Sequence, residues 1–326
     1  MRRLLIIYNP RSSRFSDVKN EVLSRLTELK GYMVGKYEVA NTNVDDNAKK
    51  LAKILKNDDL VVAAGGDATA VIAANAILQS DKNITLAVLP YGNFNDLSRT
   101  LGTETLEDVV TWTGGVAGGT PTARSREAST AGETATTGPV QKLYPLEIYI
   151  DDKFFRYATC YVTIGMTAEA VELFDKPKVR KKLKTSSGRS FGSYLSLASW
   201  YFKNRHRKIF LPEFKLNGEL QHRKTSDYAA VNGSSMARVM KGGDDYQNPT
   251  VFRSETDRLT SFWRLVKLLT KSILSRIPGS ETKGDILEFI RPSTVELQAE
   301  GEYTTFENIN KIEIKKGEKC LKVVKK

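Results

Sequence analysis

The sequence is poor in cysteine and has no long apolar run. Its two cysteines, Cys160 and Cys320, lie far apart and show no metal-ligand spacing, which predicts neither a disulfide framework nor a zinc site. No run reaches the roughly 18 apolar residues that a membrane-spanning helix needs. The apolar stretch from Leu4 to Tyr8 is too short for the core of a signal peptide. We therefore expect a cytoplasmic protein.

Acidic residues are also in short supply. The chain carries 50 Lys and Arg against 38 Asp and Glu, a net charge of +12. Such an excess indicates an anionic partner, which could be nucleic acid, an anionic membrane surface or a phosphorylated small molecule. Because zinc-finger spacing, RNP-type aromatic motifs and internal repeats are missing, we expect no nucleic-acid partner. At 326 residues, the chain is long enough for two domains.

The first hundred residues alternate between strand-like and helix-like patterns. Apolar, strand-like runs occupy Leu4–Tyr8, Tyr37–Ala40, Leu60–Ala64 and Ile84–Leu89, and helical periodicity occupies Asp17–Lys30, Asp45–Leu55 and Ala70–Leu78. This order predicts a parallel sheet covered by helices, an α/β domain.

The stretch LVVAAGGDATA, residues 60–70, reads as a strand, a tight turn and the start of a helix. Gly65 and Gly66 have no Cβ atoms, so a polyanion can approach their backbone closely. The N–H groups of the following helix can point at phosphate oxygens. A turn that needs glycine only for its dihedral angles explains the same pattern, so both readings stay open here.

Two further turns follow predicted strands of the same sheet. Asn9 comes after the first strand, and residues Gly92–Asp96 come after the strand that ends at Leu89. In parallel sheets, ligands bind beyond the carboxyl ends of the strands. We therefore expect all three turns to line one ligand site.

The second half of the chain has a different character. Residues 111–140 are dominated by Gly, Ser, Thr, Ala and Pro, which predicts a flexible linker. After Leu143, short β-branched and aromatic runs such as FFRYATCYVTI and KIEIKK indicate a mostly antiparallel β domain. Two helical segments, Gly192–Lys203 and Arg258–Ile277, interrupt it.

Some basic segments of this half could meet a membrane. The segment Arg258–Ile277 has an apolar side and a basic side, so it could lie in a bilayer interface or simply cover a core. The clusters Lys176–Lys184 and Arg205–Lys208 could bind anionic headgroups or belong to solvated loops.

Four motifs together carry a family resemblance. Asn9-Pro10, VVAAGGDAT at 61–69, LPYGNFNDLSRTLG at 89–102 and Glu300-Gly301-Glu302 resemble the diacylglycerol kinase catalytic domain family, which includes bacterial soluble lipid kinases and sphingosine and ceramide kinases. The resemblance implies a fold of the NAD kinase and diacylglycerol kinase type. Its nucleotide-binding α/β domain, with a parallel sheet in three layers, would span residues 1–112 and regain residues 305–326. A linker at 113–140 and a β-rich sandwich domain for the lipid substrate at 141–304 would complete it.

The resemblance also implies which residues form the site. Those placed at the nucleotide are Asn9, Thr42, Gly65, Gly66, Asp67, Thr69, Gly92, Asn95 and Asp96. Glu300 takes the position of the general base, and Asp67 and Glu302 are the other expected catalytic carboxylates. Magnesium favours carboxylate oxygens together with substrate phosphates, so we expect Asp67 and Glu302 to bind it.

Three residues depart from the family pattern. Ala68 replaces a glycine, Phe94 puts a ring in the second turn, and Glu300 replaces an aspartate. We expect an ATP- and magnesium-dependent kinase that converts a lipid, foremost diacylglycerol, to its phosphate at an anionic membrane surface. We expect it to associate peripherally with the membrane, and it could form a homodimer. The alternatives are a catalytically impaired nucleotide- or lipid-binding homologue and a soluble-substrate kinase of the NAD kinase type.

Overall fold

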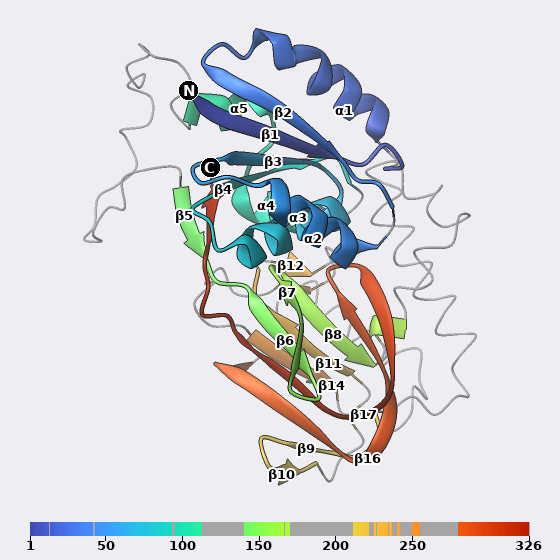
Figure 1. Ribbon diagram of the computed structural model, residues 1–326. Coiled ribbons are helices and arrows are strands. Elements are labelled where there is room, and N and C mark those ends of the chain that lie inside the picture. Colours follow the sequence, from blue (N-terminus) through green and yellow to red (C-terminus); the bar gives the residue numbers. More distant parts are fainter. Residues whose placement is uncertain are drawn as a thin grey trace.

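The computed structural model describes residues 1–12, 14–41, 43–92, 95–112, 140–165, 167–169, 211–221, 225, 227–233, 235–236, 240–241, 250–254 and 280–325. They form two sheets, one above the other in Figure 1. Within these residues, no helix combines the length and apolarity needed to cross a membrane. Outside them lie Thr42, Phe94, residues 113–139, the two segments expected to be helical, Gly192–Lys203 and Arg258–Ile277, and the two basic clusters.

The first sheet has six strands in the order β2-β1-β3-β4-β18-β5. Its strands are β1 (Arg2–Tyr8), β2 (Tyr32–Glu38), β3 (Leu60–Gly65), β4 (Thr85–Pro90), β5 (Val140–Leu143) and β18 (Leu321–Val324). Strands β1 to β4 and β18 run parallel, and β5 pairs antiparallel with β18. The parallel sheet expected from the alternating sequence pattern is confirmed.

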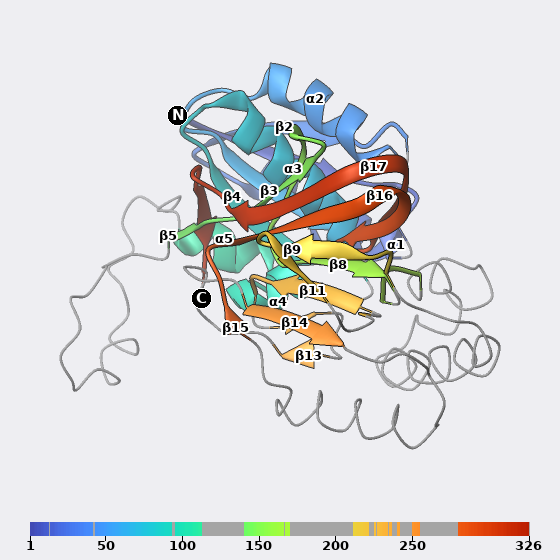
Figure 2. The ribbon, with the colours of Figure 1, turned by 90° about the horizontal axis from the view of Figure 1, so that it is seen from below.

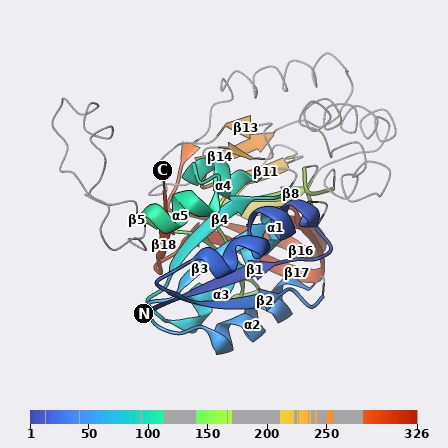
Figure 3. The same cartoon turned by 90° about the horizontal axis from the view of Figure 1, so that it is seen from above.

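Helices cover both faces of this sheet (Figure 3). They are α1 (Phe15–Glu21), the 3₁₀ helix η1 (Leu23–Glu28), α2 (Val44–Ile54), α3 (Asp67–Ser80), α4 (Asp96–Leu101) and α5 (Leu106–Trp112). Alternate residues of each strand enter opposite cores, so that Leu5 and Val61 pack with α2 and α3 while Leu4 and Val62 pack with α1 and α5. The three layers follow from this alternation.

Two boundaries in this domain differ from the sequence-based expectation. The helix expected over Asp17–Lys30 is α1 followed by η1, with a break at Val22. The strand expected at Tyr37–Ala40 is β2, which begins at Tyr32 and ends at Glu38. Strand β2 begins earlier than expected because it pairs with β1 over its whole length.

The second sheet is antiparallel and has ten strands (Figure 2). They are β6 (Leu146–Ile150), β7 (Lys153–Ala158), β8 (Tyr161–Gly165), β9 (Phe214–Leu216), β10 (Glu219–Leu220), β11 (Asp227–Val231), β14 (Thr250–Ser254), β15 (Ser280–Glu281), β16 (Gly284–Ala299) and β17 (Glu302–Lys316). A separate hairpin joins β12 (Ser235–Met236) to β13 (Met240–Lys241). The expected β-rich second domain is confirmed.

Strand membership refines the expected domain limits. Of the segment 305–326 that was expected to return to the first domain, β18 joins the first sheet, whereas the part up to Lys316 belongs to β17 in the second. Strand β5 at the end of the expected linker also joins the first sheet. The chain therefore crosses between the sheets through β5 and again before β18.

The second sheet packs directly on helix α3. The Asn75 side chain donates to the Tyr157 carbonyl and accepts the Tyr157 N–H, both at 3.0 Å. Because Asn75 is fully buried, these two bonds fix the height of β7 against α3. They hold the β7–β8 turn beside the carboxyl edge of the first sheet.

Candidate functional site

The glycine turn after β3 is packed too tightly for side chains. A Cβ atom on Gly65 would lie 2.4 Å from Thr69 Oγ1. A Cβ atom on Gly92 would lie 2.4 Å from the Gly66 Cα atom, and the Tyr91 N–H donates to the Gly65 carbonyl at 3.1 Å. The two expected phosphate turns are therefore in backbone contact with each other.

Asp67 joins the first of these turns to helix α4. Its carboxylate accepts the N–H groups of Asp96 at 2.9 Å and of Asn95 at 3.2 Å. Burial raises the pKa of Asp67, and the backbone hydrogen bonds from Asp96 and Asn95 oppose this effect. Asp67 thus caps α4 while it begins α3.

Asn95 shapes the second turn. It adopts the left-handed conformation, with φ of 55°. Its Oδ1 atom accepts the Gly92 N–H at 2.7 Å, and its Nδ2 atom donates to the carbonyls of Gly92 at 2.9 Å and Pro90 at 3.2 Å. The side chain expected at the nucleotide is directed at the turn's own backbone, so its described role is structural.

The turn after β1 reaches the same edge of the sheet. Asn9 accepts the Arg11 N–H on its side-chain oxygen at 2.9 Å, an Asx turn. Arg14 donates to the Pro90 carbonyl at 2.9 Å and lies over the Tyr91 ring. The three turns therefore lie at the same edge of the sheet.

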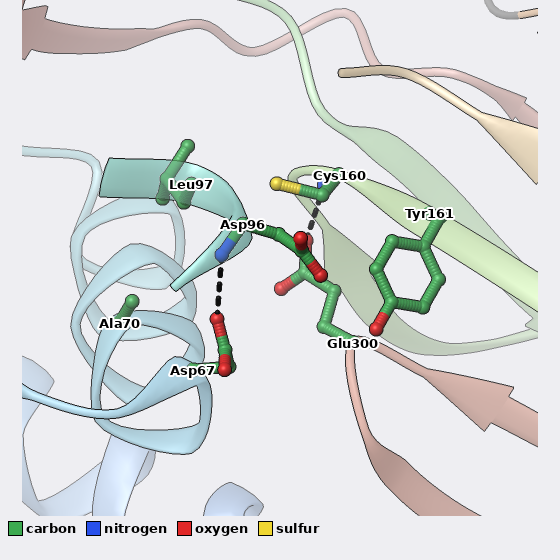
Figure 4. Close-up of a pocket in the computed structure, with 7 residues that line it drawn as sticks. All are labelled: Asp67, Ala70, Asp96, Leu97, Cys160, Tyr161 and Glu300. Carbon is green, nitrogen blue, oxygen red and sulfur yellow. Dashed lines mark hydrogen bonds between the residues drawn. The ribbon is translucent and has the colours of Figure 1, made fainter. Parts of the chain in front are cut away.

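A small pocket opens where these turns meet the second sheet (Figure 4). Its lining consists of Asp67, Ala70, Asp96, Leu97, Cys160, Tyr161 and Glu300, which come from α3, α4, the β7–β8 turn, β8 and the β16–β17 turn. It offers 10 Å³, room for about one water molecule. A single hydroxyl group fits such a space, whereas a nucleotide or an acyl chain does not.

Glu300 enters this pocket from a strained hairpin turn. Ala299 pairs with Glu302, so Glu300 and Gly301 form a two-residue loop, and both have positive φ, 52° and 89°. This is the geometry of a type I′ turn, and the left-handed conformation costs a residue such as glutamate about 1 kcal/mol. Within this turn the Glu300 side chain is buried, at 5% exposure.

The environment of Glu300 shifts its titration toward neutral pH. Burial raises the pKa of Glu300 to about 7, and the Asp67 charge adds to the rise. Hydrogen bonds from the Thr159 hydroxyl, at 2.5 Å, and from the Cys160 N–H reach Glu300 Oε1 and oppose the shift. Glu300 can therefore gain and lose a proton near pH 7.

The departures from the family motif can now be placed. Ala68 lies in α3 and has no positive φ, so its methyl group causes no backbone strain there. Phe94 lies outside the described residues. Glu302 begins β17 and does not line the pocket, although it was expected beside Asp67.

Three pocket or pocket-supporting residues had no sequence signal. The run FFRYATCYVTI indicates β structure, and it divides at Thr159 and Cys160 between β7 and β8. Tyr161 then lines the pocket from the first position of β8. No local motif marks this division, because it results from the pairing of β7 with β6 and of β8 with β11 and β16.

The donor set suits a magnesium ion shared with phosphates. Among the described residues, no three His, Cys, Asp or Glu side chains form a group that could hold a metal ion alone. Magnesium commonly takes only one or two protein carboxylates and completes its shell with phosphates and water. Asp67, Asp96 and Glu300 all line the pocket, and three acidic residues around one small pocket fit a cation.

Comparisons with known proteins agree with the family resemblance. Residues 3–123 match the family described as the diacylglycerol kinase catalytic domain. A diacylglycerol kinase of Bacillus subtilis (strain 168) is 38% identical over 104 residues, which cover 31% of this chain and 34% of that protein. The predicted family resemblance is confirmed. A diacylglycerol kinase of Staphylococcus aureus (strain MRSA252) is 33% identical over 103 residues, 31% of this chain and 32% of that protein.

Solved diacylglycerol kinase structures extend the likeness to the whole fold. The crystal structure of a diacylglycerol kinase from Bacillus anthracis str. Sterne aligns with a TM-score of 0.65 at 16% identity, covering 99% of this chain and 97% of that one. At this identity the match shows the fold alone. The sequence matches to the diacylglycerol kinases of Bacillus subtilis and Staphylococcus aureus span about a third of those proteins, at 34% and 32%.

Proposed function

We propose that this protein is an ATP-dependent lipid kinase that transfers the γ-phosphate to a lipid hydroxyl, with diacylglycerol as the acceptor and phosphatidic acid as the product. The observation that carries the proposal is Glu300, a carboxyl group with a pKa of about 7 in a pocket with room for one hydroxyl. A general base works best when its pKa lies near the working pH. The match to diacylglycerol kinases over residues 3–123 supports the same reaction class.

The nucleotide lies on the first-domain side of the pocket in this proposal. The glycine turn at Gly65 and Gly66 leads into α3, a helix of 14 residues, whose first N–H groups and dipole favour phosphate. Asn9, Thr42, Thr69 and Gly92 complete the proposed nucleotide site. Magnesium, when bound, would neutralise phosphate charge, and Asp67 and Asp96 are the residues that would hold it. Glu302, two residues after Glu300 in the sequence, lies outside the pocket lining.

The acceptor hydroxyl approaches from the second-sheet side. Glu300 accepts its proton while the bonds from Thr159 and Cys160 keep the carboxylate oriented. The surrounding walls, formed by Ala70, Leu97 and Cys160, limit access by water. The burial of the base and the exclusion of water by the pocket walls both favour phosphoryl transfer to an alcohol over hydrolysis.

A lipid acceptor requires contact with a membrane surface. The net charge of +12 supports binding to anionic bilayers as a peripheral protein. The proposal includes this association, and a homodimer is compatible with it. The charge is screened by salt, so the association should weaken as ionic strength rises.

The decisive experiment is phosphoryl transfer to lipid vesicles. Wild-type protein is incubated with γ-labelled ATP, magnesium and vesicles of anionic phospholipid with or without diacylglycerol, and label is counted in the lipid fraction. We expect label only with diacylglycerol, and a loss of about 100-fold in Glu300→Gln. Glu38→Gln is the matched control, since Glu38 ends β2 and is exposed.

Other outcomes separate the alternatives. Label appearing in NADP when NAD replaces the vesicles would assign a soluble-substrate kinase. Nucleotide-induced thermal stabilisation without transfer to any acceptor would assign a binding protein that has lost catalysis. Either result would overturn the lipid kinase proposal.

A further inference from the structure

A row of polar side chains leads from the pocket across the second sheet. Residues of β8 and β16 alternate between two faces. One face, with Val162, Ile164, Leu297 and Ala299, belongs to the apolar core. The other carries Tyr161, Thr163, Gln298 and Glu300. Gln298 pairs with Thr163, and continuing this register places Glu300 opposite Tyr161.

The hydrogen bonds along this row all run the same way, from Thr163 through Gln298 to Tyr161. The Thr163 hydroxyl donates to Gln298 Oε1 at 2.7 Å, which turns the amide nitrogen of Gln298 toward Tyr161. Gln298 Nε2 then donates to the Tyr161 hydroxyl oxygen at 3.4 Å. Tyr161, Thr163 and Gln298 are 3%, 0% and 1% exposed. Burial of a polar group costs free energy unless the group is hydrogen-bonded. A buried row of polar side chains in a sheet therefore indicates a functional role.

The row leaves one proton without an acceptor. Because Gln298 donates to the Tyr161 oxygen, the Tyr161 O–H must donate elsewhere. Among the described residues, no acceptor for this proton is found within hydrogen-bond distance. Tyr161 also lines the pocket beside Glu300 (Figure 4). Burial raises the pKa of Tyr161 well above its ordinary value, and it therefore stays a donor at neutral pH.

We propose that the Tyr161 hydroxyl binds the attacking oxygen of the acceptor alcohol, and that Gln298 and Thr163 position Tyr161 for this contact. The inference rests on the proposed kinase function and deepens it. An alcohol oxygen in a pocket with room for one hydroxyl accepts from Tyr161 and donates to Glu300. These two contacts fix both the position and the orientation of the nucleophile, on which transfer rates depend steeply.

The transfer step balances without further reactants. The acceptor O–H gives its proton to the Glu300 carboxylate, and its oxygen forms a bond to the γ-phosphorus. The bond from that phosphorus to the β,γ-bridging oxygen breaks, and ADP leaves with the electron pair. Tyr161 keeps its proton throughout, so its role is to bind and orient.

The first test is Tyr161→Phe, which removes the hydroxyl and keeps the ring. With diacylglycerol in anionic vesicles, we expect kcat/KM for the acceptor to fall about 10-fold, while the KM for ATP stays unchanged. Tyr149→Phe is the matched control, because it also removes a tyrosine hydroxyl from this domain but one bonded to Glu147. The control should match wild type.

The second test asks whether Gln298 acts through Tyr161. Gln298→Met keeps the length of the side chain and removes both hydrogen bonds, and we expect a smaller loss of acceptor kcat/KM than in Tyr161→Phe. In the double variant, Gln298→Met should add nothing to Tyr161→Phe. Additive losses would instead indicate that Gln298 only supports the fold.

Distinct results separate this inference from the proposed function. Wild-type transfer with an unchanged Tyr161→Phe overturns the role of Tyr161 and leaves the kinase proposal standing. No transfer by wild type overturns both. Thermal unfolding is measured for each variant, and if Tyr161→Phe does not fold, Gln298→Met and Thr163→Val replace it. These two variants must then lower acceptor kcat/KM without changing the KM for ATP, or the inference fails.

Discussion

The Asp67 carboxylate accepts the Asp96 N–H at 2.9 Å, so the first residue of α3 holds the start of α4. It also accepts the Asn95 N–H at 3.2 Å, which ties it to the second turn. One side chain thus fixes the distance between the two turns that flank the proposed phosphate site. A change at Asp67 should therefore affect stability as well as activity.

Asp67→Ala removes a cap and leaves buried N–H groups without an acceptor. The N–H groups of Asn95 and Asp96 both lose their acceptor, and each unpaired buried donor costs about 1 to 3 kcal/mol, so we expect the free energy of unfolding to fall by about 2 kcal/mol or more. Urea unfolding measures the change. Asp108→Ala is the control, because Asp108 accepts the Thr105 N–H at an exposed helix start and should cost less. Equal losses of unfolding free energy in both variants would contradict the role of Asp67 in holding the start of α4.

The pKa of Glu300 should make stability depend on pH. Its folded pKa of about 7 exceeds the ordinary value of 4.5, so the folded state binds this proton more tightly than the unfolded state. The stabilisation is present below pH 4.5 and is lost as pH rises to 7, by about 3 kcal/mol in all.

Glu300→Gln isolates this contribution, since its amide oxygen can still accept from Thr159 and Cys160. Asp227, whose pKa is also about 7, titrates in both proteins and cancels in the difference. We expect wild type to lose more unfolding free energy than Glu300→Gln between pH 5 and pH 7.5 in urea titrations. Parallel pH profiles would show that Glu300 ionises normally.

The same ionisation should control transfer. Glu300 must be deprotonated to accept the acceptor's proton, so kcat/KM for the lipid should rise with pH and level off above an apparent pKa near 7. The profile is measured with diacylglycerol vesicles at constant ionic strength. Tyr161→Phe should lower the plateau and keep the same apparent pKa. A profile that is flat from pH 5 to 8 would remove Glu300 from the role of base.

Local patterns in the sequence were enough to predict β1 to β4 and the turns that follow β1, β3 and β4, whereas β5 and β18 join the sheet through pairing between distant segments. Runs of apolar residues and glycine-containing turns are local features of the sequence, so they can be recognised without the structure. The Thr159 contact with Glu300 spans 141 residues and depends on the register of β8 against β16. The sequence likewise shows the amide of Asn95 but not the left-handed backbone that turns it toward Gly92 and Pro90. The sequence motifs therefore do not reveal contacts that depend on cross-strand register and turn geometry.

Gly92→Ala should disrupt the contact between the turn that contains Gly66 and the turn that contains Gly92. The added methyl carbon would lie 2.4 Å from the Gly66 Cα atom and 2.8 Å from Asn95 Oδ1, and backbone cannot give way cheaply. We expect a loss of about 1 to 3 kcal/mol in unfolding free energy and loss of ATP-induced thermal stabilisation. Gly233→Ala is the control, because its nearest contacts would be 3.6 Å. Retention of normal ATP binding by Gly92→Ala would show that the contact between the turns is dispensable.

Ala68→Gly tests whether the departure from the family motif impairs the protein. If the turn needed a glycine here, the substitution would raise activity. Ala68 is instead the second residue of α3 and has no positive φ, so glycine adds only backbone freedom. Glycine in a helix costs up to about 1 kcal/mol relative to alanine, and we expect slightly lower stability with ATP affinity and kcat unchanged. The measurements are urea unfolding, ATP binding by calorimetry and lipid phosphorylation on one preparation. Because Gly65 and Gly66 already supply the close approach, a rise of several-fold in kcat would mean that the helix must unwind at Ala68 during turnover.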